Sequence, residues 1–241
     1  MAVRTVLFDL YGTLADIKID ERAIAPWTRL TALLSRWDGT AEPADLRECY
    51  DRLSAEAAAV HGKGFVILRV FEQLLKQHGA PADIATVATF ARVFRRASTV
   101  NLTRRPYADS LLRRLRDQRV RLGLVSNTEG ILTREDLDQL QFWEFFDAIV
   151  LSSEVGAEKP EPEVLRIALR RLGGASASAV MVGDTWETDV LAAERAGMRA
   201  VYLDDAQGLG SWVHHSARIV SAHPDEAAIL QALQALGVPL S

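Results

Sequence analysis

Six short runs of apolar and β-branched residues stand out along the chain. Each run is too short for a buried helix, and polar or turn-forming residues bound it on both sides, which is the pattern expected of buried strands. The six predicted strands are Thr5–Phe8, Leu122–Val125, Ala148–Leu151, Ala179–Val182, Ala200–Leu203 and Arg218–Val220.

Helical patterns separate the later strands. Tyr107–Gln118 carries three leucines on one face, and Pro162–Leu172 opens with proline and ends before two glycines. Glu187–Ala196 and Asp225–Leu236 each stop at a glycine, as helices commonly do. Strands that alternate with helices predict parallel βαβ units, so we expect an α/β fold with an open, doubly wound, Rossmann-like sheet.

The stretch from Asp16 to about Thr99 interrupts this alternation. It shows no convincing strand, and its apolar residues recur at helical spacing. We expect helices at Ala25–Leu34, Asp45–Val60, Phe65–Gln77 and Ile84–Arg96. The sequence therefore predicts an all-helical domain over residues 16–99, inserted into an α/β core built from residues 1–15 and 100–241.

Composition and charge narrow the class of protein. Of the 241 residues, 49% are hydrophobic, which excludes a wholly disordered chain, and the net charge of −4 gives no reason to expect nucleic acid or an anionic membrane. No stretch reaches the ~18 apolar residues that a spanning helix needs, and the first apolar run stops at Asp9, unlike a signal peptide. We expect a cytoplasmic protein, monomeric or homodimeric.

Three reactive side chains fall where predicted strands end: Asp9, Ser126 and Asp184. Ligands of open α/β sheets bind beyond the carboxyl ends of the strands, so these residues are candidates for one site. Gly12 and Thr13 follow Asp9 closely, in a loop whose backbone amides suit an oxyanion.

These residues carry a resemblance to a known family. Asp9-Leu10-Tyr11-Gly12-Thr13-Leu14, then Ser126-Asn127, Lys159-Pro160, and Gly183-Asp184 with Asp189 five positions on, follow each other in the order of the four motifs of haloacid dehalogenase-like (HAD) hydrolases. The motifs span residues 9 to 189 and are weak singly but specific together. The helical insert resembles the helical cap (C1 type) of this family.

The resemblance implies a set of roles. Asp9 is the nucleophile, which splits one difficult displacement into the formation and hydrolysis of a covalent intermediate. Ser126 and Lys159 stabilise the transferring oxyanion, and Lys159 is one of only four lysines beside 24 arginines. Gly12, Thr13 and Asn127 bind substrate.

The resemblance also implies a Mg²⁺ ion at the same place. Asp9, Asp184 and the backbone carbonyl of Tyr11 are its expected ligands, all of them hard oxygen atoms. Asp189 either reaches the metal through water or orients Lys159. In the cap, Lys63 lies in a glycine-flanked break between two predicted helices and is a further candidate for substrate binding.

Tyr11 departs from the phosphatase pattern. Phosphatases of the family usually carry a second aspartate two residues after the nucleophile, as general acid and base, whereas the form D-x-Y-G-T resembles the 2-haloacid dehalogenases. Those enzymes generally lack the acidic Gly-Asp pair and need no metal. Because Asp184 beside Asp9 is costly without a cation, we favour a Mg²⁺-dependent phosphatase acting on a small phosphorylated metabolite.

Two alternatives stay open. One is a metal-independent 2-haloacid dehalogenase that forms an ester on Asp9. The other is a catalytically weakened module that binds a phosphoryl ligand, or another small anion, without turning it over.

Overall fold

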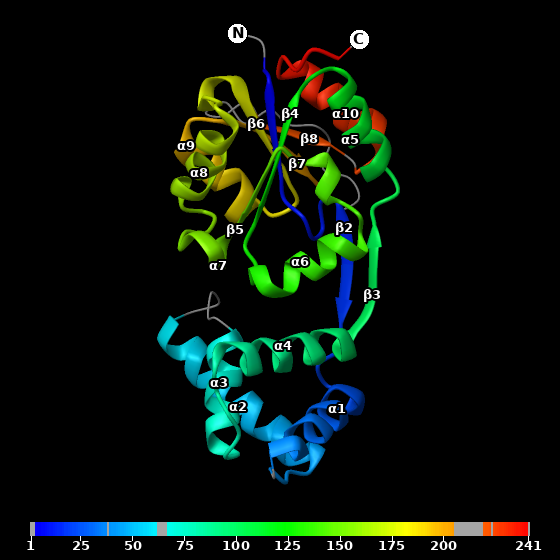
Figure 1. The fold of residues 1–241 in the computed structure, drawn as a ribbon. Coiled ribbons are helices and arrows are strands. Elements are labelled where there is room, and N and C mark those ends of the chain that lie inside the picture. Colours follow the sequence, from blue (N-terminus) through cyan, green and yellow to red (C-terminus); the bar gives the residue numbers. More distant parts are fainter. Residues whose placement is uncertain (1–2, 38, 62–66, 205–218, 223, 241) are drawn as a thin grey trace. The chain divides into compact units, whose positions relative to one another are not determined.

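The computed structural model describes residues 3–37, 39–61, 67–204, 219–222 and 224–240. The chain divides into two compact units (Figure 1). The first contains Met1–Ile17, Leu102–Gly130 and Asp136–Ser241, and the second contains Lys18–Asn101 with Ile131–Glu135.

The first unit is built on a six-stranded parallel sheet in the order β5-β4-β1-β6-β7-β8. Its strands are β1 (Thr5–Phe8), β4 (Arg121–Ser126), β5 (Ala148–Leu151), β6 (Ala179–Gly183), β7 (Arg199–Leu203) and β8 (Ile219–Ala222). All six lie where the sequence predicts strands, and the α/β fold with a parallel central sheet is confirmed. The first strand of the chain is a central strand, paired with β4 and β6.

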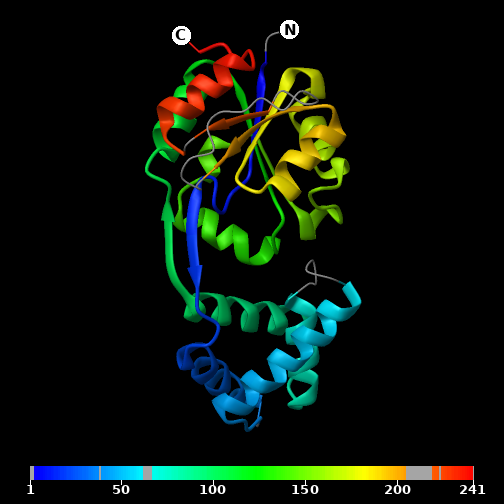
Figure 2. The same cartoon turned by 180° about the vertical axis from the view of Figure 1, so that it is seen from behind.

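Helices cover both faces of this sheet (Figures 1 and 2). Alternation along β1 explains why, since Val6 and Phe8 are buried in one apolar cluster and Leu7 in another. The first cluster includes residues of α5 (Ala108–Asp117), α6 (Gly130–Gln139) and α10 (Glu226–Ala235). The second includes residues of α8 (Pro162–Leu172) and α9 (Leu191–Ala196). A strand buried on both faces must be apolar throughout, as Thr5–Phe8 nearly is.

The second unit contains four longer helices: α1 (Ile24–Leu34), α2 (Pro43–His61), α3 (Ile67–Gln77) and α4 (Ile84–Ser98). Their apolar faces meet in an aromatic cluster formed by Trp27, Tyr50, Phe71, Phe90 and Phe94. The ring of Phe94 lies 5.1 Å from Trp27, 5.1 Å from Tyr50 and 5.3 Å from Phe71, within the range of favourable ring contacts.

The expectation that residues 16–99 hold no strand is wrong at both ends. β2 (Ala15–Ile19) and β3 (Thr99–Arg104) pair in a two-stranded sheet. Ala15 is the one buried residue of these two strands, so they lack the apolar alternation by which a half-buried strand is recognised. Backbone pairing holds the two strands together.

Several short or polar helices were also not predicted. α6 carries little apolar periodicity, and α7 (Ser152–Val155) is a single turn. The predicted helix Glu187–Ala196 begins as a π-helical turn at Trp186–Val190 before it continues as α9. Three 3₁₀ turns complete the described elements: Ser35–Trp37, Trp143–Phe145 and Ser176–Ser178.

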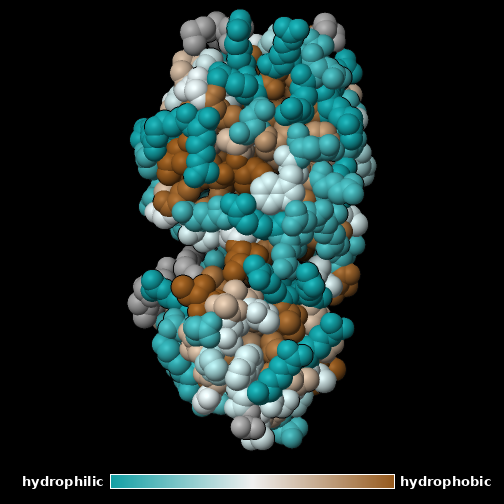
Figure 3. All heavy atoms as spheres, viewed as in Figure 1, coloured by the Kyte–Doolittle hydropathy of each residue, from teal (hydrophilic) through white to brown (hydrophobic). Residues whose placement is uncertain are grey.

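The face drawn in Figure 3 shows hydrophilic residues over much of each unit, with apolar patches among these residues. Among the described residues, no helix is both long enough and apolar enough to cross a bilayer.

Candidate active site

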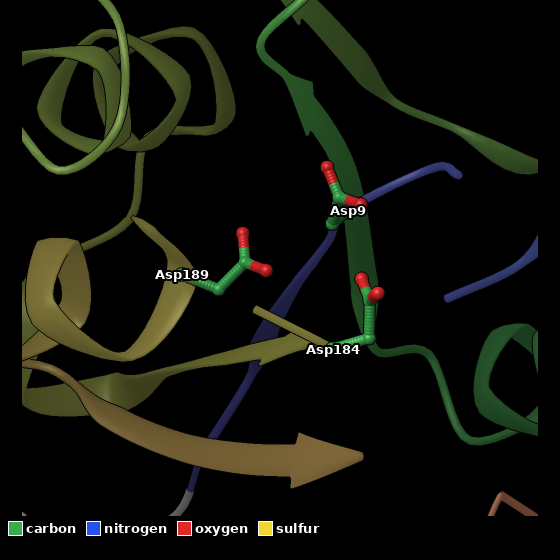
Figure 4. Close-up of side chains that lie close together, drawn as sticks. All are labelled: Asp9, Asp184 and Asp189. Atoms are coloured by element: carbon green, nitrogen blue, oxygen red, sulfur yellow. The ribbon is translucent and has the colours of Figure 1, made fainter. Parts of the chain in front are cut away.

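Three carboxylates meet beyond the carboxyl ends of the central strands (Figure 4). Asp9 follows β1, Asp184 follows β6, and Asp189 lies in the π-helical turn after it. One oxygen atom from each lies within 4.8 Å of the others. Asp9 is held in line with the sheet, because its backbone N–H donates to the Val182 carbonyl at 3.0 Å. Parallel strands end at one edge, so residues far apart in the sequence come together there.

Lys159 is buried among these carboxylates, with a 3% exposed fraction. Its ammonium donates to Asp9 Oδ1 at 2.6 Å, to Asp189 Oδ1 at 2.6 Å and to the Val125 carbonyl at 2.9 Å. Burial by itself would lower the pKa of Lys159, but the charges of Asp9 and Asp189 outweigh it and raise the pKa. The ammonium is therefore charged at neutral pH and fixed against the predicted nucleophile.

Asp184 is half-buried and accepts a hydrogen bond from Thr13 Oγ1 at 3.1 Å. Burial raises the pKa of Asp184, and the nearby charge of Asp9 raises it further. Gly12 makes this approach possible, because a Cβ atom there would overlap the Asp184 carboxylate and the residue has a φ of +85°. Thr13, one of the predicted substrate-binding residues, thus hydrogen-bonds to Asp184 through its side chain.

Both carboxylate oxygens of Asp189 have partners. Oδ1 accepts from Lys159, and Oδ2 accepts from the Thr185 N–H at 3.0 Å. A Cβ atom at Gly183 would overlap this carboxylate, so the glycine of the Gly183-Asp184 pair gives room to Asp189. Of the two roles that the sequence leaves open for Asp189, its hydrogen bond from Lys159 fits the orientation of that lysine.

Asn127 lies beside the Lys159 main chain. Its Nδ2 donates to the Lys159 carbonyl at 2.7 Å, and its Oδ1 accepts from the Lys159 N–H at 2.8 Å. Ser126, the preceding residue, is buried as the last residue of β4. Neither contact of Asn127 could be read from the sequence, which shows only a polar residue at a strand end.

A sequence profile of haloacid dehalogenase-like hydrolases matches residues 3–197. The chain belongs to this family. The match spans both units and all four motifs, and it makes the protein a hydrolase.

Relatives of this HAD-like hydrolase include named phosphatases. A glyceraldehyde 3-phosphate phosphatase from Methanopyrus kandleri is 32% identical over 83% of this chain and 84% of its own. A phosphoserine phosphatase from Thermus thermophilus is 35% identical over 56% of this chain and 53% of its own.

Solved structures share the fold of the hydrolase. A 2-haloacid dehalogenase from Pseudomonas syringae superposes with a TM-score of 0.67 at 23% identity, over 97% of this chain and 99% of its own. A HAD phosphatase from Thermococcus onnurineus superposes with a TM-score of 0.60 at 23% identity, over 95% of this chain and 97% of its own. Since the two carry different names, the fold alone does not choose between the two chemistries.

Tyr11 of the hydrolase is tied to a residue that sequence reasoning missed. Its hydroxyl donates to Asp136 Oδ2 at 2.5 Å, and Asp136 is buried on α6. No motif marks Asp136, and the helix that carries it has a weak apolar pattern, so the sequence offered no signal for it. At the position where phosphatases of the family usually carry an acid, the hydrolase has a phenol whose proton points to a carboxylate.

The donor set of the hydrolase fits a divalent cation. Asp9 and Asp184 offer hard carboxylate oxygens, which Mg²⁺ prefers, and a cation between them would offset the repulsion that raises the pKa of Asp184. Lys159 already neutralises the side of the cluster that faces Asp189. Lys63, the predicted substrate-binding residue of the cap, lies outside the described residues.

Proposed function

We propose that the hydrolase is a Mg²⁺-dependent phosphatase that acts on a small phosphorylated metabolite through an aspartyl-phosphate on Asp9. The observation that carries this proposal is the position of Asp184, half-buried and within reach of the Asp9 carboxylate. A second carboxylate beside the nucleophile is unfavourable unless a cation lies between them. The metal-independent 2-haloacid dehalogenases generally lack this second carboxylate.

Residues of the chain perform the covalent steps. Lys159 holds Asp9 Oδ1, which leaves Oδ2 to attack phosphorus. An Asp9 O–P bond forms while the ester P–O bond breaks, and the leaving group departs with the electron pair. Water then attacks the phosphorus, releases phosphate and restores Asp9. The Lys159 ammonium, close to Asp9, stabilises the phosphoryl oxygens as charge develops on them.

Asp9, Asp184 and the backbone carbonyl of Tyr11 would hold the Mg²⁺. When bound, the ion supplies positive charge that lets an anionic phosphate approach an anionic nucleophile. Asp189, with both oxygens engaged, would reach the ion only through water.

Tyr11 sets the expected range of substrates. An alkoxide leaving group needs a proton, and loss of general acid catalysis typically costs ~10²–10⁴-fold. The Tyr11 hydroxyl donates to Asp136, so it is poorly placed to supply that proton. We expect aryl and acyl phosphates, whose leaving groups are weak bases, to react faster than alkyl phosphates.

The named activities of the M. kandleri and T. thermophilus relatives support a small phosphorylated metabolite as the substrate class. Both named substrates are alkyl phosphates, so the slower reaction expected from Tyr11 concerns the rate on such esters and not whether they are accepted. A cytoplasmic location and a monomer or homodimer complete the proposal.

The test measures two products side by side. Phosphate release is followed on aryl, acyl and alkyl phosphates with Mg²⁺ or with EDTA, and halide release is followed on 2-chloropropionate, with Asp9→Asn as the blank. We expect phosphate release that needs both Mg²⁺ and Asp9. Halide release that persists in EDTA, without phosphate release, would establish the dehalogenase instead. Beryllofluoride binding without any turnover would establish the binding module.

A further inference from the structure

The side-chain amide of Asn127 makes a two-point contact with a single peptide segment. Its donor and its acceptor both go to the main chain of Lys159, at 2.7 and 2.8 Å. These are good hydrogen-bond lengths, and the paired geometry fixes the plane of the amide. Asn127 itself is exposed, whereas Lys159 is buried.

This contact matters because Lys159 is buried. A buried N–H and a buried carbonyl must find partners, and here Asn127 supplies both. Without the amide, the main chain of Lys159 would leave this position to reach water or another partner. The loop between α7 and α8 is thereby attached to the end of β4.

Lys159 is consequently held at both ends. Asn127 fixes its main chain, and three acceptors fix its ammonium: Asp9, Asp189 and the Val125 carbonyl. A lysine side chain is long and flexible, so the place of its nitrogen depends on where its Cα is anchored. A shift of about 1 Å in a catalytic group can cost ~10²-fold in rate.

We propose that Asn127 is a positioning residue, which sets the Lys159 main chain so that the ammonium meets Asp9. It acts on the reaction through Lys159 rather than by binding substrate, the role that its motif position implies. The inference rests on the proposed function, because it takes Asp9 as the nucleophile and Lys159 as its partner.

The experiment is a double-mutant cycle on phosphate release from an aryl phosphate with Mg²⁺. It uses the wild type, Asn127→Ala, Lys159→Met and the double variant. In Asn127→Ala we expect kcat to fall ~10–100-fold, the usual cost of losing an outer hydrogen-bond partner, with KM within ~3-fold of wild type. In the Lys159→Met background the same change should cost less than ~3-fold, because its target is gone.

Arg195→Ala is the matched control. Arg195 is exposed and also donates to the main chain of this loop, but its acceptor is the carbonyl of Pro160 (3.2 Å), the residue after Lys159. We expect its kcat to stay close to wild type. A loop that merely needs any tether would lose activity equally in both variants, which would overturn the proposal.

A second readout does not depend on turnover. Urea unfolding of the same four proteins without Mg²⁺ should show that the two substitutions are not additive in stability, since both loosen the same ion-pair cluster. Should Asn127→Ala fail to fold, Asn127→Asp replaces it, because it keeps the acceptor for the Lys159 N–H and loses the donor.

The outcomes separate the two proposals. A raised KM with unchanged kcat, or equal costs of Asn127→Ala in both backgrounds, would assign Asn127 to substrate binding and overturn the inference. No change in either constant would overturn it as well. Full activity in Asp9→Asn would overturn the proposed function itself, whatever Asn127→Ala does.

Discussion

The two units bury different kinds of side chain. Every buried charged residue in the described part of the chain belongs to the first unit: Asp9, Asp136, Lys159, Asp189 and Asp204. In the second unit, the described interior is aromatic and aliphatic, and its buried polar residues are the neutral Ser98 and Thr133. The first unit therefore buries charged side chains, whereas the described interior of the second unit does not.

The difference shows what the sheet makes possible. Removing charges from water is expensive unless partners and hydrogen bonds compensate. The ends of parallel strands supply such partners at fixed places, as the Val125 carbonyl and the Thr185 N–H do here. The helices of the second unit have their own backbone groups paired internally, so their interior has less to offer a charge. We therefore expect catalysis in the first unit, where charged side chains are buried despite the free-energy cost.

Removing the buried cation should have the largest effect. Lys159→Met leaves Asp9 and Asp189 facing each other, and breaking such a buried pair costs ~3–5 kcal/mol of unfolding free energy at pH 7. Without the ammonium, burial and the charge of Asp9 raise the pKa of Asp189 with no opposing cation. The folded variant then binds a proton more tightly than the unfolded chain, so the deficit should shrink as the pH falls. We also expect kcat to fall ~10²–10³-fold.

Urea unfolding at pH 5 and 8, together with phosphate release, measures these effects. Wild-type stability in Lys159→Met would show that the charged interior needs no internal cation, and the contrast between the two units would lose its basis.

A methyl group at Gly183 should have an intermediate effect. In Gly183→Ala the new Cβ overlaps the Asp189 carboxylate, and such overpacking costs ~1–3 kcal/mol. Because Asp189 holds Lys159, kcat should fall by more than the stability loss explains.

Gly79→Ala is a poor control, since Gly79 has a φ of +70°. Gly174→Ala is better, because its Cβ would meet Thr5 Oγ1 at 3.1 Å, away from the carboxylate cluster. Equal kcat losses in both alanine variants would contradict the account of Gly183.

A change in the aromatic cluster should have the smallest effect and no pH signature between pH 7 and pH 8. Phe94→Leu keeps the site apolar and should cost ~1 kcal/mol through lost ring contacts. The titratable group at the cluster is Glu21, whose carboxylate interacts with Tyr50 and whose pKa is raised by burial. The loss should therefore be the same at pH 7 and pH 8, where Glu21 keeps one protonation state. Trp27 lies 5.1 Å from Phe94, so its fluorescence follows the unfolding. A loss that changes between these two pH values would blur the contrast between the units.

The strands and the placing of the site follow from the sequence to a large extent. Apolar runs mark the six strands of the central sheet because both faces of that sheet are buried. Asp9 and Asp184 could be placed at one edge because parallel strands end together. Partners on polar elements could not be found this way, since Asp136 lies on a helix with little periodicity and β2 and β3 lack alternation. The use of Asn127 depends on a backbone segment 32 residues away, and no local pattern records that contact.

The central place of β1 has a consequence for how the protein is made. Thr5 pairs with Arg121 and with Ala179, so the strand that leads into Asp9 emerges from the ribosome long before either neighbour exists. The four helices of the second unit lie between β1 and β4 in the chain, so their mutual packing, that of α1 on α4 included, needs no residue that follows α4. During synthesis the helical unit can fold while β1 waits unpaired, and the carboxylate cluster assembles only after β6 has been added. The nucleophile is thus translated before the whole helical unit, and its site is completed only after that unit has been made.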